Sequence, residues 1–258
     1  MPEKKEEKKN PASIKHMAHE ALHDLIHFDS KFFRTLPPLV FKPGYLAEQS
    51  FTSKQNQYVK PFALFVFLNF IFFIFKSPGL FGYSLYSYGD TSWIREIILR
   101  QQAEQHLSLN ILTERFNMAM RFEQKEYLVI MVPLFALILQ LLYVFKRRNY
   151  AEHLVFALYF YSFFIIYLMV MPYVIILFVS LMKKLNIGLD ILYSQDALVC
   201  LIFIVCFIYL FFAVRKVYKE KWIWNLLKSV ILSCGVYYLI AFVYRYVLFF
   251  IVMHSIAG

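Results

Sequence analysis

The sequence has few charged residues and few cysteines, and both shortages narrow its class. Charged side chains make up 17% of the 258 residues and apolar ones 60%, whereas a soluble globular domain is about 25% charged and about 45–50% apolar. A water-soluble core cannot absorb that excess of apolar residues, but a bilayer can. The three cysteines, Cys200, Cys206 and Cys234, lie in apolar runs without metal-ligand spacing, so no disulfide framework is expected.

Two further absences exclude other classes. None of the seven histidines adjoins another. A membrane di-iron hydroxylase or desaturase has His boxes that include paired histidines, so the sequence does not indicate an enzyme of that class. No apolar run follows the charged tail within the first 30 positions, so a signal peptide is not expected. The net charge of +10 comes from Lys and Arg at the ends of apolar runs. That placement is typical of a membrane protein, and we expect no nucleic-acid partner.

The longest apolar run, Leu154–Met182, contains no Asp, Glu, Lys, Arg or His. A bilayer core about 30 Å thick needs roughly 20 such residues in a helix. Together with the other apolar runs it predicts an all-α fold, a polytopic transmembrane helical bundle of about five spans. The predicted spans are residues 61–81, 127–145, 152–182, 197–214 and 226–253, within a membrane domain of residues 61–258.

The segments outside the spans also show local signals. Residues 1–12 form a charged, disordered-looking tail, and residues 13–60 form an arm that begins with an amphipathic helix. Pro43–Gly44 predicts a turn, and a short helix is expected from about Tyr45. In the loop 82–125 we expect two helices separated near Ser108 or Asn110. Asn149 with a glutamate three residues later fits a capping box that opens the third span.

Basic residues set the predicted orientation. The turn after the second span contains Lys146, Arg147 and Arg148, and the turn after the fourth contains four more Lys and Arg residues. Because cytoplasmic loops are enriched in Lys and Arg, both turns and the arm are expected inside. The N-terminus is then cytoplasmic, the C-terminus is extracytoplasmic, and the loop 82–125 faces outward.

Candidate metal ligands lie on the amphipathic helix of the arm, where four histidines share one face: His16, His19, His23 and His27. The stretch HEALH resembles a zincin motif, with Glu20 as the general base. A wider oxygen and nitrogen site would form if the arm docked on the turn before the third span. Its ligands for zinc or another divalent ion would be His19, His23, His27, Asp29, Glu152 and His153. We favour the alternative, a polar face that contacts lipid phosphates or basic turns without any cofactor.

Polar residues inside the spans are a second set of candidates. Asn69, Gln140 and Ser162 interrupt apolar runs, and Arg245 lies within the fifth span. A charge at that depth is costly unless it pairs or snorkels. Glu126 and Asp196 are the expected ion-pair partners, and the alternative is a site for an anionic substrate or headgroup.

Two stretches resemble the signatures of a bacterial membrane-protein family of unknown function. The first runs from HDLIHFD through TLPPLVFKPG to QYVKP, and the second is NYAEHLVFALYF. Members of that family often carry an N-terminal zinc ribbon with paired CxxC motifs, which this chain lacks. Matching positions are His23, His27, Asp29, Thr35, Leu36, Pro43, Gly44, Tyr58, Pro61, Asn149, Tyr150, Glu152 and His153. The resemblance implies a multi-pass protein of the bacterial inner membrane and names no reaction.

These observations favour a non-enzymatic accessory, scaffold or lipid-interacting component of the membrane. Its expected partners are the lipid bilayer and another membrane protein. Two alternatives stay open: a metal-dependent membrane enzyme that uses the His stripe, and a small transporter or lipid-handling protein with a site near Arg245.

Overall fold

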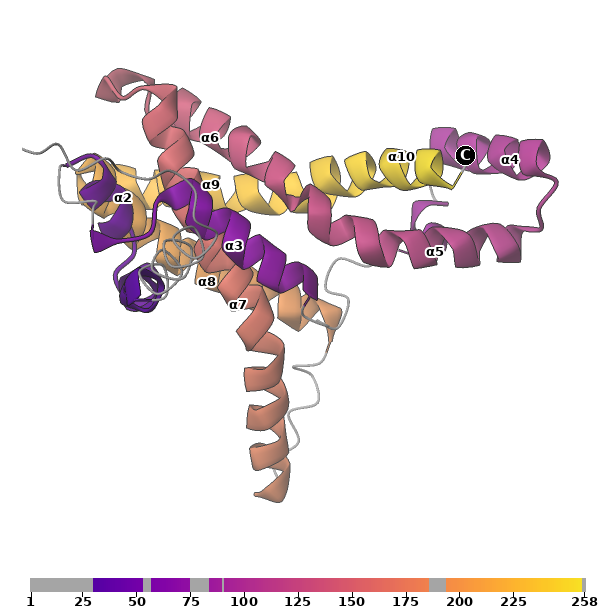
Figure 1. Ribbon diagram of the computed structural model, residues 1–258, viewed down its shortest axis with the longest axis horizontal. Coiled ribbons are helices and arrows are strands. Elements are labelled where there is room, and N and C mark those ends of the chain that lie inside the picture. Colours follow the sequence, from indigo (N-terminus) through magenta and orange to yellow (C-terminus); the bar gives the residue numbers. More distant parts are fainter. Residues whose placement is uncertain (1–29, 53–56, 75–83, 90, 186–193, 257–258) are drawn as a thin grey trace, which may run out of the picture.

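The computed structural model describes residues 30–52, 57–74, 84–89, 91–185 and 194–256, and within those ranges it contains helices and no strands (Figure 1). A helix over residues 30–41 comes first. It ends in a turn in which Gly44 takes a left-handed conformation with φ of 76° and precedes α2, Tyr45–Ser50. The predicted turn at Pro43–Gly44 is therefore confirmed. Helix α3, Pro61–Ile74, follows after a short connection.

The middle of the chain forms a helical hairpin. A short 3₁₀ turn, Leu85–Tyr88, leads to α4, Ser92–Gln105, and α5, Leu109–Glu126. The Ser108 side chain caps α5 by accepting a hydrogen bond from the Ile111 backbone N–H at 3.4 Å. This confirms the predicted separation of two helices near Ser108, because the hydroxyl satisfies an N–H that the helix itself leaves without an acceptor.

The remaining helices are long and apolar. A 3₁₀ segment, Tyr127–Ile130, leads into α6, Met131–Leu142, and after a basic turn α7 runs from Tyr150 to Lys184. The predicted capping box is present at the start of α7. Helix α8 covers Gln195–Tyr218. Helix α9, Trp222–Tyr238, continues through a π-helical segment, Leu239–Tyr244, into α10, Arg245–Ser255.

Three of these helices are long and apolar enough to cross a membrane: Tyr150–Lys184, Ala197–Tyr218 and Trp222–Ser255. Two shorter apolar helices, Pro61–Ile74 and Tyr127–Leu142, are about 21 and 24 Å long at the helical rise of about 1.5 Å per residue. Both are shorter than a bilayer core of about 30 Å. The all-helical fold, with three helices long and apolar enough to span a membrane, is thus confirmed for the described residues, and the count of five spans stays a prediction.

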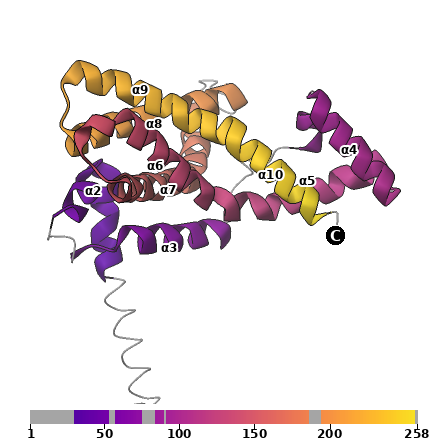
Figure 2. The same ribbon diagram turned by 90° about the horizontal axis from the view of Figure 1, so that it is seen from above.

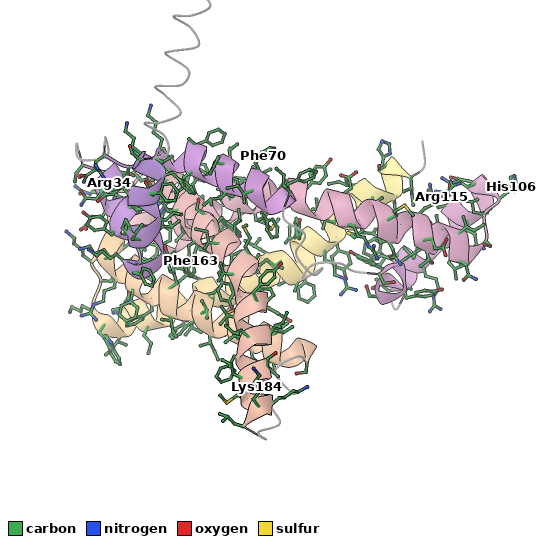
Figure 3. The ribbon with its side chains drawn as sticks, turned by 60° about the horizontal axis from the view of Figure 1, so that its bottom comes forward. Arg34, Phe70, His106, Arg115, Phe163 and Lys184 are labelled. Carbon is green, nitrogen blue, oxygen red and sulfur yellow. The ribbon has the colours of Figure 1, made fainter. Side chains whose placement is uncertain are left out.

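Helices α6 and α7 lie between α3 on one side and α8 and α9 on the other (Figure 2). The last turns of α7 extend beyond the other described helices to Lys184 (Figures 1 and 3). The α4–α5 hairpin packs along α10 at the end of the molecule opposite α2. Its tip, His106, and Arg34 of the first described helix lie far apart (Figure 3).

Aromatic residues occupy both the core and the periphery. Phe135 of α6 packs against Phe160 and Tyr161 of α7 with ring centroids 5.0 and 5.9 Å apart, and all three side chains are fully buried. By contrast, Phe70 of α3 is 61% exposed and points away from the protein (Figure 3). An exposed apolar side chain of this kind is typical of a helix that faces lipid.

Candidate functional site

Four helix ends meet at one end of the molecule: the C-termini of α6 and α8 and the N-termini of α7 and α9. The turn after α6 contacts the turn after α8, since Lys146 Nζ lies 3.6 Å from a carboxylate oxygen of Glu220. The same oxygen is 2.8 Å from Lys228 Nζ of α9. Glu220 is therefore a shared counter-ion that holds two basic elements together. We call this region, with α2 beside it, the basic end.

A buried aromatic stack underlies the basic end. The rings of Tyr143 and Tyr218 are stacked with centroids 3.8 Å apart, and the Lys228 ammonium lies 4.3 Å from the centroid of Tyr143. His153 is fully buried, and its Nδ1 lies 2.6 Å from the Tyr218 hydroxyl oxygen. The stack joins α6, α7 and α8, so the helix ends form one packed unit.

Arg148 lies above this stack at the start of α7. Its guanidinium carbon is 4.6 Å from the ring centroid of Phe51 and 5.6 Å from that of Tyr218. Nη2 donates a hydrogen bond to the carbonyl oxygen of Val217 at 3.0 Å, and Nη1 donates to Glu152 Oε1 at 3.3 Å. These contacts fix the orientation of the guanidinium plane.

Helix α2 adds a carboxylate to the basic end. Glu48 lies 3.2 Å from Lys216 Nζ and 3.8 Å from Lys219 Nζ, which links α2 to the end of α8. Tyr45, the first residue of α2, contacts Tyr58 with ring centroids 6.2 Å apart. Their hydrogen bond, with partial burial, raises the pKa of Tyr58 above the ordinary tyrosine value.

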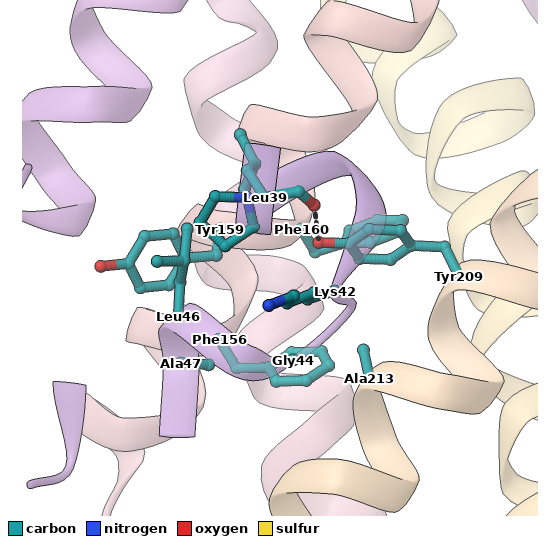
Figure 4. Close-up of a pocket in the computed structure, with 11 residues that line it drawn as sticks. Leu39, Lys42, Gly44, Leu46, Ala47, Phe156, Tyr159, Phe160, Tyr209 and Ala213 are labelled. Carbon is teal, nitrogen blue, oxygen red and sulfur yellow. Dashed lines mark hydrogen bonds between the residues drawn. The ribbon is translucent and has the colours of Figure 1, made fainter. Parts of the chain in front are cut away.

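The turn before α2 packs directly on α7 and α8 (Figure 4). The Tyr209 hydroxyl of α8 donates a hydrogen bond to the carbonyl oxygen of Leu39 at 3.0 Å. The void left between the turn and the two helices is about 10 Å³, no larger than one water requires. A Cβ on Gly44 would lie 2.5 Å from the carbonyl oxygen of Ala213. Glycine is therefore required at this position by its positive φ and by close contact with α8.

Hydrogen bonds hold the residues before α3 against the same helices. Thr35 Oγ1 is buried, accepts from the Val59 backbone N–H at 3.1 Å and donates to the carbonyl oxygen of Lys31 at 2.6 Å. The Tyr159 hydroxyl of α7 lies 3.1 Å from Ser50 Oγ and 3.4 Å from the Val59 carbonyl oxygen. The described residues 30–52 and 57–61 are thus joined to α7 by polar contacts as well as by apolar packing.

The predicted metal ligands fall into two groups. His19, His23, His27 and Asp29 lie outside the described residues. Glu152 pairs with Arg148 and accepts a hydrogen bond from the Asn149 backbone N–H at 3.2 Å through Oε2. His153 points instead into the aromatic stack. Within the described part of the chain no three His, Cys, Asp or Glu residues are grouped as metal ligands would be.

Arg245 contacts the 3₁₀ turn before α4. Its Nη2 donates to the carbonyl oxygen of Ser87, and its guanidinium carbon lies 4.7 Å from the ring centroid of Tyr88. The Tyr88 hydroxyl donates to the Arg245 carbonyl oxygen at 3.0 Å. The side chains of the predicted partners Glu126 and Asp196 lie outside the description, so that pairing stays a prediction.

The other intramembrane polar residues lie on α3, α6 and α7. Asn69 Oδ1 and Gln140 Oε1 are buried and have no hydrogen-bond partner among the described residues. Ser162 is buried and donates to the carbonyl oxygen of Leu158, one turn earlier in α7, at 2.7 Å. These residues are on separate helices, and no contact between them marks a common site.

Sequence reasoning missed several residues that build the basic end. Tyr143 and Tyr218 join the helix ends, but each is one tyrosine among nineteen and neither lies in a motif. The contact between Gly44 and Ala213 also gives no local signal in the sequence, because the two residues are far apart in the chain. The glycine itself was signalled by its position after a proline.

Comparison with known proteins gives a match to a family model over one segment of the chain. No curated protein and no solved structure matches the chain. The segment that matches, residues 29–73, begins just before the first described helix. It covers the turn at Gly44, α2 and nearly all of α3, and this part of the chain packs on α7 and α8. Residues 29–73 match the family described as a protein of unknown function (DUF3667), which confirms the resemblance to an uncharacterised family over this segment.

Proposed function

We propose that the protein is a multi-pass component of the bacterial inner membrane, without enzymatic activity of its own, which binds lipid headgroups at its basic end. The observation that carries the proposal is the meeting of two basic turns. The turns 144–149 and 215–221 contain seven Lys and Arg residues and one carboxylate, Glu220. The Lys146–Glu220 ion pair brings them together at 3.6 Å.

The charge at the two ends of the molecule differs. Residues 82–126, which include the α4–α5 hairpin, carry five basic and six acidic side chains, so that region is close to neutral. Anionic lipids of the cytoplasmic leaflet attract basic residues near the surface by about 1 kcal/mol each. The basic end is therefore the part of the protein suited to anionic headgroups.

Exposed aromatic side chains surround the basic end. Trp222 and Trp224, at the start of α9, are 57% and 58% exposed, and Phe145, in the turn after α6, is 93% exposed. Trp is enriched where a membrane helix passes through the headgroup region, because its ring is apolar and its N–H is polar. Basic and aromatic residues at the same helix ends support headgroup depth for this region.

The orientation of the protein across the membrane follows from the charge of the basic end. The basic end faces the cytoplasm, as the positive-inside rule requires. Gln105 Nε2, at the end of α4, donates to the carbonyl oxygen of Ile256 at 2.8 Å, so the α4–α5 hairpin lies beside the far end of α10. The hairpin and the C-terminus then lie outside.

Lipid binding by the detergent-solubilised protein tests the proposal. Native mass spectrometry would count phosphatidylglycerol and phosphatidylcholine molecules bound to the wild type and to the double variant Arg147→Gln with Lys221→Gln. Both side chains are exposed, and at about 1 kcal/mol per charge their loss should weaken phosphatidylglycerol binding by about tenfold to thirtyfold. Phosphatidylcholine binding should change little.

The matched control is Arg100→Gln with Arg115→Gln, which removes two exposed charges from the α4–α5 hairpin. It should leave phosphatidylglycerol binding unchanged. Equal loss in both double variants, or no preference of the wild type for phosphatidylglycerol over phosphatidylcholine, would contradict the proposal.

A further inference from the structure

An open hollow lies at the basic end between α2 and the junction of α7 and α8. Its volume is about 410 Å³, and it is lined by Glu48, Gln49, Phe51, Thr52, Arg148, Val217 and Lys219. Ligand pockets are commonly about 300–1,000 Å³, so the hollow is large enough for a lipid headgroup. Its charged lining contains two cations and one carboxylate.

Arg148 forms the fixed cationic part of the hollow. Phe51 and Tyr218 hold its guanidinium plane, and two of its N–H groups bond to Val217 and Glu152. A guanidinium has five N–H donors in a rigid plane, so three stay available for an acceptor in the hollow. A planar, oriented guanidinium is suited to two oxygens of one phosphate.

Lys219 is a second and more mobile cation. Its side chain is 77% exposed, and its distance of 3.8 Å from Glu48 is long for an ion pair. Exposed pairs of this kind contribute little stability, so Lys219 is free to turn toward a phosphate. Glu48 keeps the closer of its two cations, Lys216 at 3.2 Å.

Glu48 adds a carboxylate to the lining of the hollow. That carboxylate lines the same space as the two cations, so it can accept hydrogen bonds from an ammonium group that a purely anionic ligand lacks. A ligand with a phosphate and an attached ammonium would contact Arg148 and Lys219 with one group and Glu48 with the other. A contact that one ligand can make and another cannot is a common source of specificity.

We propose that this hollow binds a phosphate linked to a primary ammonium group, the chemistry of a phosphatidylethanolamine headgroup. This inference rests on the proposed function, which places the basic end, and the hollow with it, at the depth of the lipid headgroups. The same chemistry occurs in soluble glycerophosphoethanolamine, so the source of the ligand is a bilayer lipid or a free metabolite.

Native mass spectrometry of the full chain in detergent tests the proposal with a series of headgroups. Phosphatidylethanolamine should bind more tightly than phosphatidylcholine by at least about tenfold, because choline has no N–H to donate to Glu48. The N-monomethyl and N,N-dimethyl forms keep some N–H donors and should bind with intermediate affinity. This comparison uses only the wild-type protein, so it does not depend on whether any variant folds. Equal binding across the series would overturn the proposal.

Substitution assigns the selectivity to residues. Glu48→Gln should remove the preference for phosphatidylethanolamine over phosphatidylcholine, whereas Arg148→Gln should weaken both through loss of the phosphate contact. The control Glu104→Gln removes an exposed carboxylate, 64% accessible, at the far end of α4 and should change nothing. A preference that survives Glu48→Gln would overturn the proposal.

Competition with soluble glycerophosphoethanolamine identifies the source of the ligand. Displacement of the lipid at comparable concentration would support a free metabolite, and retention of the lipid would support the bilayer. The two proposals fail separately. If only the preference for ethanolamine is absent, the double variant Arg147→Gln with Lys221→Gln should still bind phosphatidylglycerol more weakly than the wild type does.

Discussion

Gly44→Ala is expected to destabilise the protein strongly. Gly44 has φ of 76°, a left-handed conformation that costs an L-residue about 1–2 kcal/mol. The added Cβ would lie 2.5 Å from the carbonyl oxygen of Ala213 and 2.8 Å from its Cα. Both atoms are backbone of α8 and cannot move as a side chain would, so an overpacking cost of about 1–3 kcal/mol is added. The expected loss is about 2–5 kcal/mol of unfolding free energy.

Thermal unfolding in detergent measures this loss through intrinsic fluorescence. For a chain of this size the midpoint should fall by roughly 5–15 °C. Two other glycines provide matched controls. A Cβ on Gly89 or on Gly235 would lie no closer than 3.4 Å to another atom, and at Gly235 that atom is the mobile Ile138 side chain. Gly235→Ala should be neutral or stabilising by up to about 1 kcal/mol. A Gly44→Ala midpoint equal to that of the wild type would refute the reasoning.

Three further predictions concern a buried hydrogen bond, a strained residue and the metal question. Thr35→Val should cost about 1–3 kcal/mol, because it leaves the buried Val59 N–H without an acceptor; thermal unfolding checks it. Lys219→Gly should stabilise the protein by about 0.5–1 kcal/mol in the same assay, because Lys219 has φ of 50°. Metal analysis of the purified protein should find less than about 0.1 equivalent of zinc or another transition metal. The double variant His19→Ala with His23→Ala should bind lipid as the wild type does.

Each of these has an outcome that contradicts it. Thr52→Val serves as the control for Thr35→Val, because the hydrogen bond from the Thr52 hydroxyl to the Gln49 carbonyl oxygen is exposed. Equal losses of unfolding free energy in the two variants would contradict the role given to burial. A lower midpoint for Lys219→Gly would mean that its pair with Glu48 outweighs the backbone strain. One equivalent of bound zinc that is lost with His19 and His23 would revive the metal-dependent alternative.

Local features of the fold were predictable because their signals lie within a few residues. The capping box uses Asn149 and Glu152, three positions apart, and the turn at Gly44 follows directly from the preceding proline. The long apolar helices were located to within about four residues at each end, because apolar runs and flanking charges mark them. Ser108 was one of two positions at which the segment 82–125 was expected to divide into two helices, and it caps α5.

Tertiary partners were not predictable in this way. The contacts of Arg245 with the carbonyl oxygen of Ser87 and with the ring of Tyr88 are one example. Every residue has a backbone carbonyl, so composition gives no signal for that choice. Likewise the contact between His153 Nδ1 and the Tyr218 hydroxyl has no signal in the sequence. Contacts between distant helices leave no periodic trace in the sequence.

The location of the basic end relative to the membrane is the central claim, and cysteine labelling tests it most directly. In a chain with Cys200, Cys206 and Cys234 replaced by alanine, a single cysteine would stand at position 106 or at position 147. The account predicts that a membrane-impermeant maleimide labels His106→Cys in intact bacterial cells and labels Arg147→Cys only after the inner membrane is permeabilised. Labelling of Arg147→Cys in intact cells would contradict it.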